Sequence, residues 1–213
     1  MPRHDAVLFD LDGTLLDSVA LILESYRHTL AAHGLAPRSR EEILEGLGTP
    51  LEAQLGRWAP ADRIEALIDT YVEHNLRVHD ELVRPFEGVN AIVHALREAG
   101  TPLAIVTSKR RRGTTQGLAA LGLSDAFDTW VCADDVARPK PHPEPVERAL
   151  AVLGVGPERA VFVGDATHDV HAGRAAGVRT VAVLWGSGSR DALAAAAPDD
   201  WAGDAAELER LLL

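Results

Sequence analysis

Cysteine is almost absent from this chain, because Cys132 is the only one among its 213 residues. A single cysteine cannot form an internal disulfide, and it leaves no pair of thiolates to hold a metal ion. The sequence also lacks a run of about 18 apolar residues, and it lacks an apolar N-terminal segment followed by a cleavage site. We therefore expect a cytoplasmic protein that makes no contact with a membrane.

Positive charge is scarce as well. The chain has 21 lysines and arginines against 32 aspartates and glutamates, which gives a net charge of −11. This balance disfavours binding to a nucleic-acid backbone, because proteins that do so present a basic face. Only Lys109 and Lys140 are lysines, so few side chains can supply a compact ammonium charge.

Apolar residues make up 46% of the chain, which is enough to bury a sizeable core. Short apolar runs predict strands at 6–9, 103–106, 130–133, 160–163 and 180–183. After residue 85 these runs alternate with amphipathic helical segments. Such alternation predicts an α/β fold with a doubly wound parallel, Rossmann-like sheet.

A helical block interrupts this pattern after the first expected strand. From about Leu16 to Arg84 the apolar residues recur at helical spacing throughout. Two capping boxes, Ser39 with Glu42 and Thr49 with Glu52, are predicted to begin helices within it. We therefore expect a core domain of residues 1–15 and 85–213 and an inserted all-helical domain of residues 16–84.

Ligands of open parallel sheets bind beyond the carboxyl ends of the strands, so the polar residues there are the candidates for chemistry. They are Asp10 and Asp12 after the first expected strand, Thr107 and Ser108 after the second, Asp134 and Asp135 after the third, and Asp165 with Asp169 after the fourth. Carboxylates that share a site repel one another, so a cluster of Asp10, Asp12 and Asp165 requires a cation. Their hard oxygen atoms favour Mg²⁺ as that cation. We expect Asp134 and Asp135, by contrast, to form only a turn.

This set of residues is typical of phosphoryl transfer. Thr107 and Lys140 add a hydroxyl donor and a positive charge that would stabilise phosphoryl oxygens. One carboxylate can attack phosphorus and form an aspartyl-phosphate, while a second protonates the leaving oxygen and later deprotonates a water. Asp10 and Asp12 suit these two roles.

Four motifs in this order carry a resemblance to a known family: Asp10-Leu11-Asp12-Gly13-Thr14, Thr107-Ser108, Lys140-Pro141-His142-Pro143, and Gly164-Asp165-Ala166-Thr167-His168-Asp169. With them the chain resembles the haloacid dehalogenase superfamily, in its phosphoglycolate phosphatase-like branch with a helical cap after the first strand. The resemblance covers nearly the whole chain. The last motif differs from the usual pattern in having Ala166 where a serine is common.

The resemblance implies a role for each motif residue. Asp10 would be the nucleophile and a metal ligand, and Asp12 would be the general acid/base and bind the metal through its backbone carbonyl. Thr107, Ser108 and Lys140 would hold the phosphoryl group, with backbone N–H donors from Gly13 and Thr14. Asp165 would ligate Mg²⁺, and Asp169 would support the metal site from behind its ligands or orient Lys140.

The expected function is thus that of a Mg²⁺-dependent phosphatase, a monomer or homodimer that hydrolyses a small phosphorylated metabolite such as phosphoglycolate through an aspartyl-phosphate. A pyrophosphatase or a sugar-phosphate mutase of the same superfamily are the alternatives. Residues 16–25 lack the histidine and lysine that mutases usually carry there. Asp12 argues against a dehalogenase, and the absence of lysine from the cap argues against a phosphonatase.

Other interpretations of the same residues remain. A signalling receiver domain also combines a phosphorylated aspartate with Mg²⁺, a threonine and a lysine, but that aspartate follows the third strand of a shorter chain. Each motif alone could also be structural: a turn, a helix cap, a loop lysine or acidic residues at a helix start. For substrate selection we expect the cap loop at 46–49 to face the site, with Arg40 or Arg57 available for a substrate carboxylate.

Overall fold

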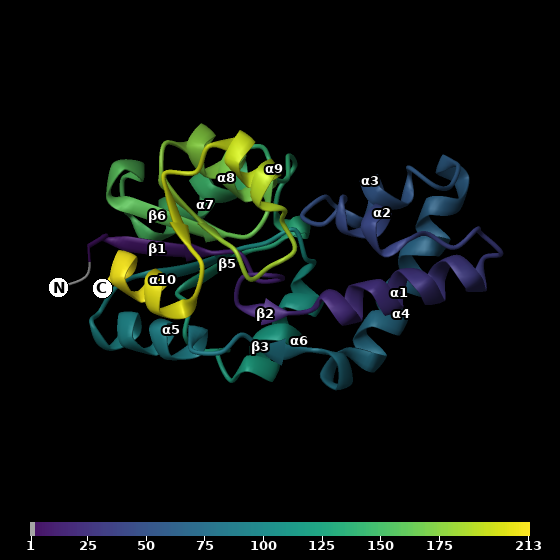
Figure 1. Cartoon of the computed structure of the whole chain (residues 1–213), viewed down its shortest axis with the longest axis horizontal. Helices are drawn as coiled ribbons and strands as arrows, with labels where there is room; N and C mark the ends of the chain where they lie inside the picture. The colour runs from purple at the N-terminus through teal and green to yellow at the C-terminus, as the bar shows by residue number, and fades with distance from the viewer. Residues whose placement is uncertain (1–2) are drawn as a thin grey trace.

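The computed structural model describes residues 3–213 and contains a six-stranded sheet whose strand pairs are all parallel. Its strands are β1 (Ala6–Phe9), β4 (Leu103–Val106), β5 (Thr129–Val131), β6 (Ala160–Gly164), β7 (Arg179–Val183) and β8 (Asp200–Ala202). They lie in the order β5-β4-β1-β6-β7-β8, so the first strand is central (Figure 1). Apolar runs buried on both faces are what a parallel sheet covered by helices requires.

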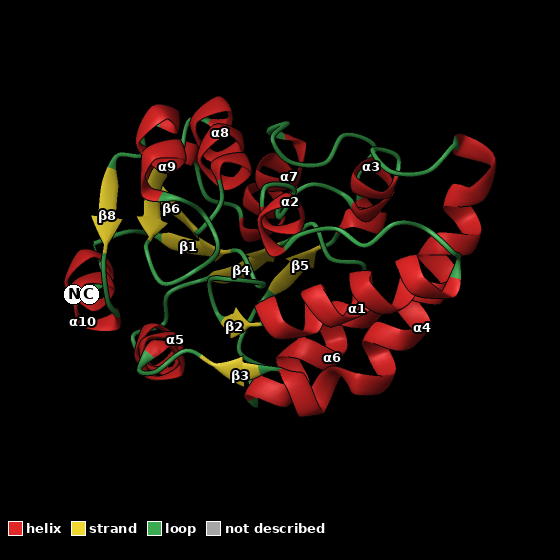
Figure 2. Cartoon of the chain, turned by 45° about the vertical axis from the view of Figure 1, so that its right-hand side comes forward, coloured by secondary structure: helices red, strands yellow, loops and turns green. Residues whose placement is uncertain are grey.

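Helices cover both faces of the sheet, as the doubly wound prediction requires. They are α5 (Val89–Glu98), α6 (Arg111–Leu121), α7 (Glu144–Leu153), α8 (Thr167–Ala176), α9 (Arg190–Ala196) and α10 (Ala205–Leu212). One core joins Val7 and Phe9 of β1 to α5, α6 and α10, and a second core joins Ala6 and Leu8 to α7 and α8. Successive β1 side chains thus point to opposite faces, and Figure 2 shows the two helical layers on either side of the strands.

The inserted segment is helical and has a core of its own. It contains α1 (Val19–Ala32), α2 (Arg40–Leu44), α3 (Leu51–Leu55) and α4 (Ile64–Leu82), with a 3₁₀ turn at Ala61–Arg63. Ile22, Tyr26, Leu55 and Leu67 are among the buried residues that pack together there. Figure 1 shows this group projecting beyond the sheet, on the side away from the two ends of the chain.

The prediction of a wholly helical stretch from Leu16 to Arg84 is wrong at both ends. A short antiparallel pair, β2 (Leu16–Asp17) with β3 (Arg84–Pro85), joins the two ends of the insertion. Strands of two residues are too short to show a hydrophobic period, so sequence periodicity could not reveal them. The pair makes both connections between the insertion and the sheet run side by side.

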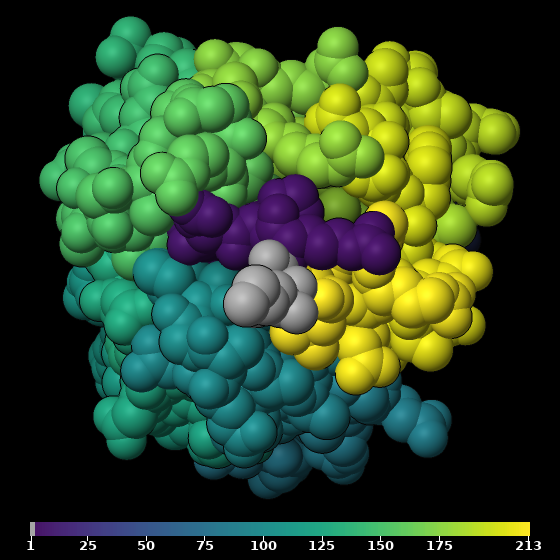
Figure 3. Space-filling view, turned by 90° about the vertical axis from the view of Figure 1, so that its left-hand side faces the viewer, coloured from purple at the N-terminus to yellow at the C-terminus, as the bar shows by residue number. Residues whose placement is uncertain are grey.

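Helix starts and the sheet edge bring further differences. Ser39 and Glu42 form the predicted capping box, whereas α3 begins after Pro50 with no side-chain cap, so the box at Thr49 and Glu52 is wrong. The edge strand β8 was not predicted, because its three residues are only partly apolar. The two ends of the described chain meet, since the N–H of Arg3 donates to the carbonyl of Leu212, and Figure 3 shows the N-terminal part of the chain, in purple, beside the C-terminal part, in yellow.

Within residues 3–213, none of the helices combines the length and apolar character that a membrane span needs.

Candidate active site

The strand ends bring four predicted residues into one buried cluster. Asp10 follows β1, Asp165 follows β6, and Asp169 lies in the first turn of α8. Lys140 reaches the same place from the loop that precedes α7. All four side chains are almost inaccessible to solvent, with residue exposures from 2% to 6%. Buried charges require partners, so their contacts define the site.

All three N–H donors of the Lys140 ammonium have acceptors within the protein. Its ammonium lies 2.8 Å from Oδ1 of Asp10, 2.5 Å from Oδ1 of Asp169 and 3.1 Å from the carbonyl oxygen of Val106. Three N–H donors thus meet three acceptors. Burial opposes the charge of Lys140, but Asp10 and Asp169 more than offset this effect and raise its pKa above the usual value. The ammonium is therefore a permanent positive charge beside Asp10.

The Asp165 carboxylate accepts hydrogen bonds from the loop that follows β7. Its Oδ2 accepts hydrogen bonds from the backbone N–H and the hydroxyl of Ser187, at 2.8 and 2.9 Å. The Thr14 hydroxyl lies 3.4 Å from its other oxygen. A side chain at Gly13 or Gly186 would overlap the Asp165 carboxylate, so both glycines permit a close approach of the chain. Sequence reasoning missed Ser187, although a Gly-Ser-Gly segment after a strand was a usable signal.

Asp12 lies beside these residues but has a partner of its own. Both of its carboxylate oxygens lie 3.0 Å from Nζ of Lys109, and its side chain is 21% exposed. It is not among the carboxylates that share the buried cluster, which are Asp10, Asp165 and Asp169. The side chain of Asp12 is thus accessible to a bound molecule in a way that the cluster is not.

The backbone donors differ from those predicted. The N–H of Gly13 donates to the carbonyl of Leu16, and the N–H of Thr14 donates to that of Leu11, so both are used by the turn that follows Asp12. The structure therefore does not leave these two N–H groups free as the phosphoryl donors that the resemblance implied. Among residues 3–213, no acceptor is found for the N–H groups of Leu11, Asp12 and Ser108.

Thr107 and Ser108 lie at the end of β4 and differ in their contacts. Thr107 is buried, and its hydroxyl oxygen accepts a 3.1 Å hydrogen bond from the N–H of Lys109. The Ser108 hydroxyl donates to the carbonyl of Gly48 at 2.8 Å, across the boundary between core and insertion. The predicted cap loop thus meets the motif residues, and Gly48 also lies against Ala166 and His168. Arg40 and Arg57 are both exposed, and Arg57 lies 3.9 Å from Glu45.

The buried carboxylates fit a divalent cation. Oxygen atoms of Asp10, Asp165 and Asp169 lie within 4.8 Å of one another. Burial and the neighbouring carboxylates raise the pKa of Asp10, although Lys140 opposes the shift. Burial and Asp169 raise the pKa of Asp165 to about 6, against the hydrogen bonds from Ser187. One ammonium does not neutralise three carboxylates, and their hard oxygens suit Mg²⁺.

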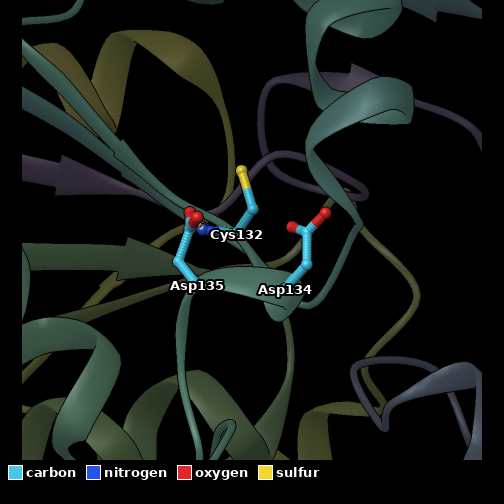
Figure 4. A group of neighbouring side chains, drawn as sticks. All are labelled: Cys132, Asp134 and Asp135. Carbon is cyan, nitrogen blue, oxygen red and sulfur yellow. Dashed lines mark hydrogen bonds between the residues drawn. The ribbon is translucent and has the colours of Figure 1, made fainter.

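A second acidic group, around Cys132, is structural. Figure 4 shows Asp134 and Asp135 on either side of Cys132 at the start of a 3₁₀ turn over Ala133–Asp135, as the predicted turn requires. The Asp135 carboxylate accepts from the backbone N–H of Cys132 and pairs with the Arg111 guanidinium. The backbone N–H of Arg111 donates to the Asp134 carboxylate. Burial raises the pKa of the Cys132 thiol to about 11, so the thiol stays protonated near neutral pH. These contacts explain the group without a metal ion.

Comparison with known proteins identifies the relatives of this arrangement. The profile of the haloacid dehalogenase-like hydrolases matches residues 7–183. The chain is 43% identical to pyrophosphatase PpaX of Halalkalibacterium halodurans, over 84% of this chain and 83% of that protein. A predicted phosphoglycolate phosphatase from Haemophilus somnus has the same fold, with a TM-score of 0.91, 23% identity and 99% of each chain covered.

A further solved structure was determined with a ligand. CbbY of Rhodobacter sphaeroides, as its D10N mutant in complex with xylulose-(1,5)bisphosphate, gives a TM-score of 0.87 at 27% identity, with 96% of each chain covered.

Proposed function

The chain belongs to the haloacid dehalogenase-like hydrolase family, and we propose that it is a Mg²⁺-dependent phosphatase that transfers a phosphoryl group first to Asp10 and then to water. One observation carries this proposal. The buried Asp10 carboxylate shares its space with Asp165, Asp169 and the Lys140 ammonium. A nucleophilic carboxylate, a cation site and a fixed positive charge are what the reaction requires.

Asp10 and Asp12 divide the chemistry. An oxygen of Asp10 attacks phosphorus, and the new bond forms as the bond to the leaving oxygen breaks. Asp12 gives its proton to that oxygen and becomes a carboxylate. In the second half, Asp12 takes a proton from a water that attacks the same phosphorus, so inorganic phosphate leaves and the Asp10 carboxylate is restored.

The other residues bind and orient the phosphoryl group. The Lys140 ammonium fixes Asp10, while Thr107 and the free N–H groups of Leu11, Asp12 and Ser108 are the donors available to phosphoryl oxygens. Asp10 and Asp165, with the backbone carbonyl of Asp12, would hold Mg²⁺, and Asp169 would hold Lys140 in place beside it. When bound, the ion supplies positive charge that offsets the charge of the phosphoryl oxygens.

The helical insertion would act as a cap. We assign residues 16–84 to it and residues 1–15 and 85–213 to the core, with the β2–β3 pair at the hinge. Closure over the site would exclude bulk water during the first half of the reaction, and opening would admit it for the second.

Two substrates follow from the relatives. Inorganic pyrophosphate comes first, because the 43% identical protein is named a pyrophosphatase. A small monoester such as phosphoglycolate, the substrate expected from sequence, comes second. Both carry a further negative charge on the part that leaves.

The test is steady-state hydrolysis of pyrophosphate, phosphoglycolate and para-nitrophenyl phosphate with Mg²⁺. We expect Asp10→Asn to reduce kcat by a factor on the order of 10⁴ or more, because the nucleophile is lost. Asp12→Asn should accumulate a phosphoenzyme from para-nitrophenyl phosphate, seen as one added phosphoryl group in the intact mass. Asp134→Asn, an exposed aspartate at the same edge of the sheet, is the matched control and should retain wild-type rates. Full activity of Asp10→Asn would exclude the covalent route, and single labelling without turnover would indicate a receiver.

A further inference from the structure

Lys109 is the other lysine of the chain besides Lys140, and the mechanism above does not use it. Its Nζ lies 3.0 Å from each carboxylate oxygen of Asp12, and its side chain is 12% exposed. The residue that holds the predicted proton donor is therefore a cation. A long side chain that is nearly buried on a charged partner is held in one position at a cost in entropy, which requires a compensating interaction.

The surrounding chain is shaped to hold this side chain. The N–H of Lys109 donates to the Thr107 hydroxyl at 3.1 Å, and its carbonyl accepts from the N–H of Ala133 at 3.0 Å. In α6, a methyl group at Gly113 would come within 2.9 Å of Cε of Lys109 and within 3.3 Å of its Cγ and Cδ. The glycine thus leaves the space in which the lysine stem lies across the helix.

The two lysines differ in how far their donors are used. Lys140 is 2% exposed and has an acceptor for each of its three N–H groups. Lys109 has acceptors for two, both on Asp12, and no third acceptor is found within the described part of the chain. One donor of Lys109 therefore remains for a ligand, on a side chain that is partly exposed.

This donor lies on the side of the leaving group. Asp12 must contact the leaving oxygen in order to protonate it, and Lys109 contacts Asp12. A leaving group that carries its own anionic group next to that oxygen therefore comes within reach of the Lys109 ammonium. Six arginines of the insertion already contact groups of the insertion itself: Arg27, Arg38, Arg57, Arg63, Arg77 and Arg84. Arg40 is exposed and has no side-chain partner among residues 3–213.

We propose that Lys109 determines substrate specificity by binding an anionic group on the leaving part of the substrate, a phosphate in pyrophosphate or a carboxylate in phosphoglycolate. This inference rests on the proposed phosphatase function and adds the substrate class that the site prefers. Substrates whose leaving group bears no further negative charge gain nothing from Lys109.

The experiment compares Lys109→Met with the wild type on three substrates in the presence of Mg²⁺. For pyrophosphate and phosphoglycolate we expect kcat/KM to fall by about 10- to 100-fold, mostly through KM, because one charge-assisted hydrogen bond is lost. For para-nitrophenyl phosphate we expect a change of less than about 3-fold, because its leaving group offers no second anion. Arg112→Met removes one charge from the exposed start of the same helix and should change none of the three values.

Two further variants guard against a purely structural effect. Lys109→Arg keeps the charge and should retain part of the preference for anionic leaving groups. Gly113→Ala keeps the lysine but displaces its stem, and it should reduce the same preference while leaving para-nitrophenyl phosphate hydrolysis intact. If Lys109→Met does not fold, these two variants decide the question.

The possible failures are distinct. A wild-type protein that hydrolyses none of the three substrates contradicts the phosphatase function itself. An active wild type with an equal loss on all three substrates in Lys109→Met shows that Lys109 only holds Asp12, and it overturns the specificity role. Unchanged pyrophosphate and phosphoglycolate kinetics overturn it as well.

Discussion

The hydroxyl of Ser108 donates a 2.8 Å hydrogen bond to the carbonyl of Gly48, and this bond ties a motif residue of the core to the loop of the helical insertion. Gly48 has a φ of +86°, a backbone conformation that glycine adopts at little cost. An added Cβ would lie 3.1 Å from that of Ala166 and 3.2 Å from Nδ1 of His168. The contact between the insertion and the core therefore depends on a residue without a side chain at this point.

Gly48→Ala should weaken closure of the insertion over the site. The new methyl group presses against Ala166 and His168, so the loop must retreat and the bond to Ser108 is strained. We expect kcat/KM to fall by about 10-fold, in line with the loss of roughly 1–2 kcal/mol of docking energy. Steady-state kinetics on the best substrate measures this.

Gly34→Ala is the matched control. Gly34 also lies in the insertion and has a φ of +65°, but an added Cβ there meets nothing within 4 Å. Both variants pay the cost of about 1 kcal/mol for a left-handed alanine, and only Gly48→Ala should change turnover. Equal kinetic losses in the two variants would mean that the Gly48 contact does not control closure.

The sheet was predictable because buried parallel strands are apolar runs with polar ends. Residues 6–9 and 103–106 form strands with the predicted bounds. The short β2–β3 pair was not predictable, because its two strands lie far apart in the chain and each is too short to carry a period.

The cluster of Asp10, Lys140, Asp165 and Asp169 could be predicted because strand order brings strand ends together. The contact between Lys109 and Asp12 could not, since the residues are 97 positions apart and the lysine reaches Asp12 only through the space beside Gly113. Backbone donors depend on turn geometry, so the sequence could not show that the N–H groups of Gly13 and Thr14 are used within the turn. The catalytic roles themselves remain predictions.

Mg²⁺ should stabilise the folded protein through the acidic cluster. Ionised Asp165 lies buried beside Asp169, and the pKa of Asp165, raised to about 6, reflects the cost of that charge. At a free Mg²⁺ concentration of about 100 times the Kd, binding stabilises the native state by about 2.7 kcal/mol. This corresponds to a rise in Tm of roughly 5–10 °C for a chain of this length. Thermal unfolding with and without Mg²⁺ measures the shift.

Asp165→Asn should lose most of this shift, because it removes a proposed ligand and part of the repulsion. Asp134→Asn, outside the cluster, should keep it. A wild-type Tm that does not respond to Mg²⁺, or an equal response in Asp165→Asn, would show that the ion binds elsewhere or not at all.

The helical insertion should lose stability in mild acid through His74. This buried histidine of α4 stacks on His28 of α1, with ring centroids 3.8 Å apart and an angle of 13° between the planes. Its Nδ1 lies 2.7 Å from an Arg77 nitrogen, which can only donate, so Nδ1 must accept and the ring is neutral. Burial, His28 and Arg77 lower the pKa of His74, while Glu24, 3.6 Å away, opposes them.

The sign of the effect follows from this lowered pKa. The unfolded chain binds a proton at His74 near pH 6.5, whereas the folded chain binds it only at lower pH, so the unfolded state holds more protons between the two values. The contribution of His74 is complete above pH 6.5 and is lost as the pH falls below it. His74→Phe keeps a stacking ring without a titrating group, so its Tm should fall less than that of the wild type between pH 7.5 and pH 5.5 in matched buffers.

His94→Phe, at an exposed position on α5, should follow the wild type. Because Asp10 and Asp165 have raised pKa values and act in the opposite direction, the difference between His74→Phe and wild type isolates the histidine. If Tm falls with pH to the same extent in His74→Phe and in the wild type, His74 does not make the stability depend on pH.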